Sequence, residues 1–134
     1  MNWTVESRHA PGFTRLVLAG AYDKQQFTAM FDELAAQDLL EIGGRYLIDQ
    51  TRFEIGQMSD LDLLHASDTF ISLNSKLAYS KIAILANPEY IGLGRKFEKI
   101  TEFASMALIE VFDSETPALL WLTGGLVRSL SQVH

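Results

Sequence analysis

The sequence predicts an α/β protein, a sandwich with a mixed, mostly parallel five-stranded sheet and helices packed on it. Short apolar runs alternate along the chain with longer segments of helical periodicity, which is typical of βαβ units. The run KIAILA at 81–86 is almost wholly apolar, as expected of a strand covered by helices on both sides. Two strand-like segments at the N-terminus predict an antiparallel hairpin. The expected order of elements is therefore β-β-α-β-α-β-α-β-α.

The hairpin and the first helix come from residues 2–34. Residues 2–7 alternate weakly, HAPG at 9–12 indicates a turn, and residues 13–22 are β-branched and apolar enough for a strand. Asp23 stands three residues before Gln26, which is the spacing of a capping box. The helix that follows places apolar residues at i, i+3, i+4 and i+7, namely Phe27, Met30, Phe31 and Leu34.

The middle of the chain predicts a buried strand and a second helix. After the glycine pair at 43–44, residues 45–51 form a short strand whose centre is apolar, so we expect it to be buried on both faces. Ser59 and Asp62 have capping-box spacing, and a helix follows to about residue 76. Its apolar stripe consists of Leu63, Ala66, Phe70, Leu73 and Leu77.

The last third predicts two more strands and two more helices. After 81–86, Asn87 and Pro88 supply an N-cap and a first-turn proline for a helix that runs to about residue 104. Residues 107–112 form the fifth strand. Asp113 or Ser114 then caps a helix through ALLWL that ends at the glycines 124 and 125. Eight aromatic or methionine side chains exceed what caps and turns require, and most of them are expected in the core: Phe27, Met30, Phe31, Phe70, Tyr90, Phe97, Phe103 and Trp121.

Length and composition indicate one soluble domain covering residues 1–134. The chain has 48% hydrophobic residues and a net charge of −6, so nucleic acid is not expected as a partner. No apolar run approaches the roughly 18 residues of a membrane span, and the N-terminus lacks the pattern of a signal peptide. We therefore expect no membrane insertion and a cytoplasmic location. The absence of cysteine removes disulfides and thiolate chemistry.

Three marks in the second half resemble the SpoIIAA-like proteins, also described as STAS/SEC14-type domains. The stretch KIAILANPEYIGLGRKFEKITEF has a strand, a proline-headed helix, and then Gly92 and Arg95. The next strand ends in Val111-Phe112-Asp113, and the last helix contains Ala118 followed by Trp121-Leu122. The order of elements also matches over essentially the whole chain. Because most of these positions are expected in the core, the resemblance is evidence for the fold before it is evidence for a function.

The resemblance implies binding without catalysis. Members of the group include bacterial anti-sigma-factor antagonists, cytoplasmic domains of anion transporters and lipid-binding SEC14 relatives. The antagonists carry a serine at a helix start that a partner kinase phosphorylates. An aligned count places Met58 at that position and Ser59 one residue later, with Gln57 and Asp60 where the motif has aspartate and glycine. This sequence therefore departs from the switch motif.

The segment LIDQTRFEIGQMSD supplies the candidate regulatory or partner-binding residues Asp49, Ser59 and Asp60. Ser59 is either a regulatory serine at the positive end of a helix dipole or an N-cap. The N-cap role alone is enough to explain a serine at this position. Asp49 is either a charge displayed at the carboxyl end of a central strand or a cap of the following loop. The expected recognition face consists of the segment from Asp49 to Asp62 and the helix from Asn87 to Lys99.

A second group, Tyr90, Gly92, Gly94 and Arg95, is the candidate ligand pocket or anion contact. No phosphate-binding glycine motif is present, because both glycines fall inside the helix. They indicate close approach of a neighbour, which is either the wall of an apolar pocket or tight packing of the helix.

No catalytic or metal site is predicted. The three histidines His9, His65 and His134 are scattered, and no nucleophile motif occurs. We expect no cofactor, and we interpret the chain as a non-catalytic bacterial domain that regulates through a protein partner. The alternative is a carrier or sensor of a small apolar or lipid-like ligand. We also expect that the chain can form a homodimer, because the tail contains the apolar residues Leu126, Val127 and Leu130.

Overall fold

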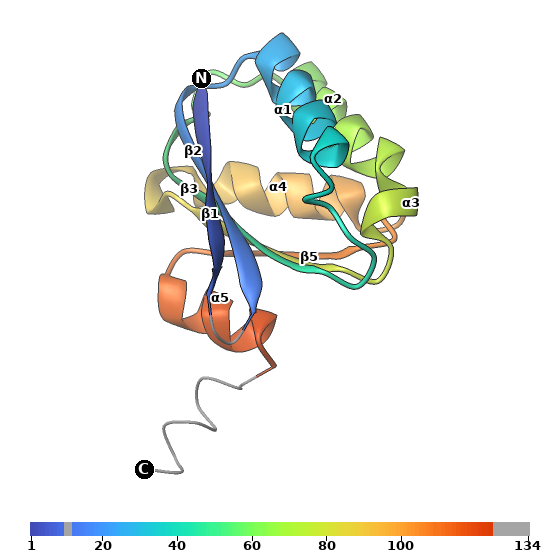
Figure 1. The fold of residues 1–134 in the computed structure, drawn as a ribbon. Helices are drawn as coiled ribbons and strands as arrows, with labels where there is room; N and C mark the ends of the chain where they lie inside the picture. The colour runs from blue at the N-terminus through green and yellow to red at the C-terminus, as the bar shows by residue number, and fades with distance from the viewer. Residues whose placement is uncertain (10–11, 125–134) are drawn as a thin grey trace.

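The computed structural model describes residues 1–9 and 12–124, which form one five-stranded sheet with helices on both faces (Figure 1). The predicted order is confirmed, with one extra short helix and a 3₁₀ turn. The strands are β1 (Asn2–His9), β2 (Phe13–Ala21), β3 (Arg45–Glu54), β4 (Lys81–Ala86) and β5 (Leu108–Phe112). The helices are α1 (Lys24–Ala36), α2 (Asp60–Ser72), α3 (Asn74–Leu77), η1 (Pro88–Tyr90), α4 (Ile91–Thr101) and α5 (Glu115–Leu122). Part of the HAPG turn and the tail with Leu126, Val127 and Leu130 lie outside the described residues.

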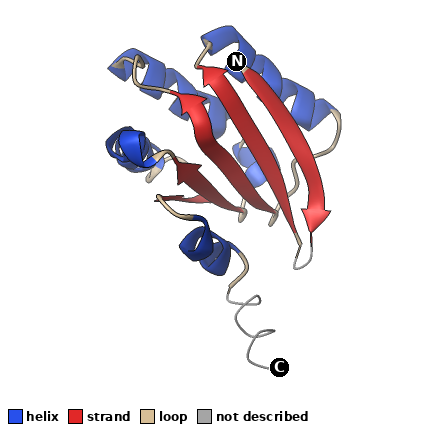
Figure 2. Cartoon of the chain, turned by 90° about the vertical axis from the view of Figure 1, so that its left-hand side faces the viewer, coloured by secondary structure: helices blue, strands red, loops and turns tan. Residues whose placement is uncertain are grey.

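The strands lie in the sheet in chain order, β1 to β5. β1 and β2 pair antiparallel, and every later pair is parallel. Parallel neighbours are joined by right-handed crossovers, so α1, α2 and α4 all lie on one face of the sheet. Among the described helices, only α5 lies on the other face (Figures 1 and 2). The predicted mixed, mostly parallel α/β sheet is confirmed.

The two faces of β4 belong to two separate cores. Ile82 and Ile84 pack into the larger core under α1, α2 and α4. Ala83 and Leu85 pack into the smaller core under α5. β3 divides in the same way because successive side chains of a strand point to opposite faces. The prediction that 81–86 is covered on both sides is confirmed, and so is the burial of residues 46–48.

The helix starts follow the predicted caps. The Asp23 carboxylate accepts the Gln26 amide at 2.9 Å, and Ser59 and Asp62 form a reciprocal capping box. Asn87 Oδ1 accepts the Glu89 amide at 3.0 Å. Ser114 holds the N-cap position of α5 without a side-chain hydrogen bond.

Three element boundaries differ from the prediction. β3 continues to Glu54, past the expected end at residue 51, because it pairs with β2 as far as Ala21. The helix expected from Asn87 to 104 is η1 followed by α4, which ends at Thr101. The second helix ends at Ser72, and α3 follows as a separate turn.

The exposed edge of β5 is occupied by side chains. The Val111 amide donates to Glu98 Oε2 at 2.7 Å, and Arg95 Nη1 donates to the Val111 carbonyl at 3.1 Å. Ser105 Oγ bonds both the amide and the carbonyl of Ala107 at 3.1 Å. Since unpaired edge groups invite pairing with another strand, these contacts protect the edge. Arg95 therefore has a structural contact.

Within the described residues, no helix is both long enough and apolar enough to cross a membrane.

The glycines of α4 provide a matched test of its packing. A Cβ built on Gly94 would lie 2.9 Å from Cγ1 of the buried Val111, whereas one on Gly92 meets nothing within 4 Å. We expect Gly94→Ala to lower the free energy of unfolding by about 1–3 kcal/mol through overpacking. Gly92→Ala should leave the free energy of unfolding unchanged or raise it by up to about 1 kcal/mol, because alanine has the higher helix propensity. Urea denaturation of both variants checks this, and equal effects would contradict the packing role of Gly94.

Candidate functional site

Asp49 lies in the interior of β3 and is 7% exposed. Its Oδ2 accepts from Arg15 Nη2 at 2.6 Å, and its Oδ1 accepts from the amide and hydroxyl of Thr51 at 3.0 and 2.7 Å. The predicted position at the carboxyl end of the strand is wrong because β3 runs five residues further. Asp49 is therefore not part of an exposed recognition face.

Arg15 connects Asp49 to α5. Its Nη1 contacts Glu115 Oε1 of α5 at 2.6 Å, and its Nε lies 3.7 Å from Glu6 Oε2. Burial opposes the charge of Asp49, but the hydrogen bonds from Thr51 and the pair with Arg15 outweigh it and hold the pKa of Asp49 below its usual value. The cluster joins β1, β2, β3 and α5, so it has a structural role.

Ser59 and Asp60 lie at the start of α2, on the helix-covered face opposite α5. Ser59 Oγ accepts the Asp62 amide at 3.2 Å, and Asp62 Oδ2 accepts the Ser59 amide at 3.0 Å. The N-cap alternative therefore describes what Ser59 does in this structure. Asp60 pairs with Lys96 of α4. The α2-start surface, as we name it, consists of these exposed residues with two exposed leucines: Ser59, Asp60, Leu61, Leu64 and Lys96.

The second predicted group does not form one pocket. Gly94 is buried against Val111, which is the tight-packing alternative, while Gly92 is exposed. Gly94 also lines an apolar cavity of only about 40 Å³ between the helices and the sheet. Tyr90 lines a different, larger cavity, and Arg95 lines neither.

That larger cavity, about 210 Å³, lies where β2, β3 and β4 end. We name it the carboxyl-end cavity; its lining includes Tyr22, Glu54, Met58, Asp62 and Tyr90. Open α/β sheets bind ligands at this edge. Tyr90 is among the predicted site residues and Tyr22 is not, although each tyrosine follows the end of a strand.

Tyr22 is held at the cavity by its hydroxyl, which lies 3.2 Å from His65 Nδ1 of α2. Its ring also packs against Phe27 and Phe53, with centroids 5.6 and 6.4 Å away. Burial, followed by the charges of Asp62 and Asp23, raises the pKa of Tyr22 to about 12. The phenol is therefore neutral at physiological pH, and its surroundings are electrically negative.

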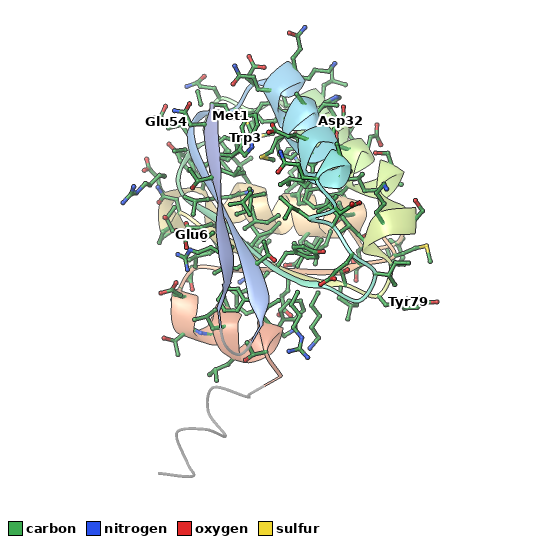
Figure 3. All side chains as sticks on the ribbon, in the orientation of Figure 1. Met1, Trp3, Glu6, Asp32, Glu54 and Tyr79 are labelled. Atoms are coloured by element: carbon green, nitrogen blue, oxygen red, sulfur yellow. The ribbon has the colours of Figure 1, made fainter. Side chains whose placement is uncertain are left out.

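The opposite end of the sheet carries exposed apolar side chains. The amino-end patch consists of Tyr79, Phe103, Met106 and Leu108, from the loops before β4 and β5 and the start of β5. Phe103 is 95% exposed and Tyr79 79% exposed. Phe103 is an exception to the expectation that most of the large aromatic side chains lie in the core, because α4 ends at Thr101. Figure 3 shows Tyr79 pointing away from the molecule, at the end opposite Glu54.

The two loops of the amino-end patch are held together by hydrogen bonds. The Tyr79 amide donates to the Met106 carbonyl at 3.1 Å. The Asn74 side chain donates to the Ala104 carbonyl and accepts the Met106 amide, both at 2.9 Å. Tyr79 has φ of 63°, in the left-handed region that bulky residues rarely adopt. No local pattern in the sequence indicates this patch, because its members come from separate elements.

Within residues 1–9 and 12–124, no three His, Asp or Glu side chains are grouped so as to hold a metal ion. Of the predicted scattered histidines, His65 is bonded to Tyr22. The His9 side chain and His134 lie outside the described residues.

The chain matches no family model and no curated protein. It is similar in structure to an uncharacterised protein of the DUF3478 family from Shewanella loihica PV-4, whose crystal structure is described as having a SpoIIAA-like fold. The TM-score is 0.59 at 16% identity, over 90% of this chain and 92% of the other. The fold is therefore SpoIIAA-like, as the resemblance implied.

The Arg15 cluster leads to a pH prediction. We expect Asp49→Asn to lower the free energy of unfolding at pH 7 by about 2 kcal/mol, because a mostly buried charge pair is lost. A depressed folded-state pKa contributes stability above the unfolded pKa of about 4, and this is lost as pH falls through the folded pKa. The difference in the free energy of unfolding between wild type and Asp49→Asn should therefore become smaller below about pH 4, as measured by denaturation curves at a series of pH values.

Glu115→Gln is the matched control, because this carboxylate contacts the same guanidinium but is 50% exposed. We expect a loss of no more than about 1 kcal/mol. A larger loss for Glu115→Gln than for Asp49→Asn would contradict the assignment of Asp49 as the main partner.

Proposed function

We propose that this SpoIIAA-like domain is a non-catalytic module that binds another protein, and that the amino-end patch is the contact surface. The observation that carries the proposal is the exposure of two aromatic rings, Tyr79 and Phe103, with Met106 and Leu108, on loops that hydrogen bonds hold together at one end of the sheet. Aromatic residues and methionine are enriched in protein interfaces, and contiguous exposed apolar patches mark interaction sites.

The backbone of the patch supports the same proposal. Asn74 and the Tyr79–Met106 hydrogen bond hold the two loops in a fixed arrangement, which lowers the entropy cost of binding. The left-handed conformation of Tyr79 costs about 1–2 kcal/mol relative to the usual backbone regions. A residue that destabilises its own fold yet displays a large ring to solvent is better explained by recognition than by stability.

The α2-start surface is a second proposed contact, and Ser59 its proposed regulatory residue. Leu61 and Leu64 are exposed beside Ser59, Asp60 and Lys96. A phosphate on Ser59 would lie at the positive end of α2 but next to Asp60 and Asp62, which oppose it. This surface has fewer large apolar side chains than the amino-end patch, so we rank it second.

The alternative function, a carrier of a small apolar or lipid-like ligand, has weaker support. The apolar cavity beside Gly94 has a volume of about 40 Å³, which is room for only a few water molecules. Drug-sized ligand pockets have volumes of about 300–1,000 Å³. A carrier would need the helices to move away from the sheet.

Tyr79→Gly separates recognition from stability. Glycine adopts positive φ without strain, so we expect the free energy of unfolding to stay the same or to rise by up to about 1 kcal/mol. Capture of a protein partner from a bacterial lysate, quantified by mass spectrometry, should nevertheless fall at least about tenfold, as for loss of an interface hot spot. Phe103→Ser should lower capture similarly without lowering stability.

Leu61→Ser is the matched control, since it removes an exposed apolar side chain from the α2-start surface. Capture that depends on Leu61 but not on Tyr79 or Phe103 would transfer the proposal to that surface. Sedimentation equilibrium of the same variants distinguishes a second copy of this chain from a different protein. Full capture by Tyr79→Gly and Phe103→Ser would contradict the amino-end patch as the contact.

A further inference from the structure

The carboxyl-end cavity combines aromatic and acidic walls. The residues that line it include the aromatic Tyr22 and Tyr90, the thioether residue Met58, and the acidic residues Glu54 and Asp62. None of the residues that line it is basic. A ligand that enters this cavity therefore lies close to two acidic and two aromatic residues, which is a poor environment for an anion.

The two carboxylates are not neutralised by cations of the protein. Among the described residues, no ion pair involves Glu54 or Asp62. Asp62 uses Oδ2 to accept the Ser59 amide, and no described group bonds its Oδ1. Glu54 is exposed at the end of β3, while its carbonyl accepts the Tyr22 amide at 3.2 Å. Both charges thus remain available to a bound ligand.

The rings are fixed in place before any ligand binds. Tyr22 is held by His65 and by its contacts with Phe27 and Phe53. Tyr90 lies so close to the loop after β3 that a Cβ on Gly56 would be 3.0 Å from its Cε1 atom. Aromatic faces attract cations within about 6 Å of the ring centroid, and the attraction is stronger when the site is desolvated.

We propose that the carboxyl-end cavity binds a small organic cation of the ammonium type. The aromatic walls accept its methyl or methylene groups, and Glu54 and Asp62 accept its charge. The volume of about 210 Å³ lies below the roughly 300 Å³ of drug-sized pockets, so the ligand is small. This site goes beyond the proposed protein-binding function and does not depend on it, because the amino-end patch lies at the other end of the sheet.

Choline is the probe, and 3,3-dimethylbutan-1-ol is its uncharged counterpart of the same shape. Both are titrated into the ¹⁵N-labelled full chain at matched sodium chloride concentration, and backbone amide shifts are followed by NMR. We expect saturable shifts with choline at residues 54–58 and at Tyr90. The uncharged alcohol should bind at least about fivefold more weakly, because it loses both the charge and the cation–π attraction.

Variants test each wall separately. Tyr90→Leu should weaken choline binding about fivefold, while Tyr90→Phe, which keeps the ring, should retain it. Glu54→Gln should weaken binding about threefold, as for a partly exposed charge. Glu102→Gln, an exposed carboxylate near the other end of α4, is the control and should change nothing.

Two outcomes would overturn the proposal. Equal binding of choline and the uncharged alcohol would mean that the cavity recognises shape and apolar surface alone. No saturable shift at residues 54–58 with tens of millimolar choline would mean that the cavity is not a cation site. Neither result bears on the amino-end patch, whose own test uses Tyr79 and Phe103.

Discussion

The structure depends on the need to cover both faces of β3 and β4. Because the parallel strands follow one another in chain order, right-handed crossovers place α1, α2 and α4 on the same face. In the part of the chain that the structure describes, α5 is the one helix that covers the other face, which includes Leu47, Ala83 and Leu85. Fully burying a leucine side chain contributes about 1.5–3 kcal/mol, so an exposed second face would cost a large share of the stability of a domain this size. The short helix at the end of the described chain is therefore essential to the fold.

Polar contacts hold α5 in position at both ends. Arg15 links Glu115, in its first turn, to the buried Asp49 of β3. Lys81 lies over the Trp121 ring and donates to the Trp121 carbonyl at 3.3 Å, near the last turn. An acid near the start and a base near the end of a helix both favour its dipole. Asp49 is thus part of the attachment of α5, which explains why a conspicuous carboxylate in a central strand is not available for recognition.

The two ends of the sheet are where function is proposed, because helices cover its faces but not its ends. The carboxyl-end cavity and the amino-end patch are connected through α2 and α3, which are separated by the single residue Leu73. Asp62, in the first turn of α2, lines the cavity. Asn74, at the start of α3, holds the loop that carries Met106. A ligand site and a protein contact in this arrangement would share a rigid support without sharing side chains, which fits a scaffold whose loops differ between proteins of the same fold.

The sequence by itself determined the order of elements, the helix caps at Asp23 and Ser59 and the burial of 81–86, because hydrogen-bonding caps and apolar periodicity act over a few residues. It also indicated the close approach at Gly94, which only glycine permits against Val111. Only the tertiary structure decided that β3 extends past Asp49, that Arg15 is its partner 34 positions away, and that Phe103 lies outside the core. Only the tertiary structure also brings Tyr22 and Tyr90 to one cavity, and places Tyr79 and Phe103 at the same end of the sheet. Parallel strands align their ends in space, so loops distant in the chain become neighbours that no local pattern records.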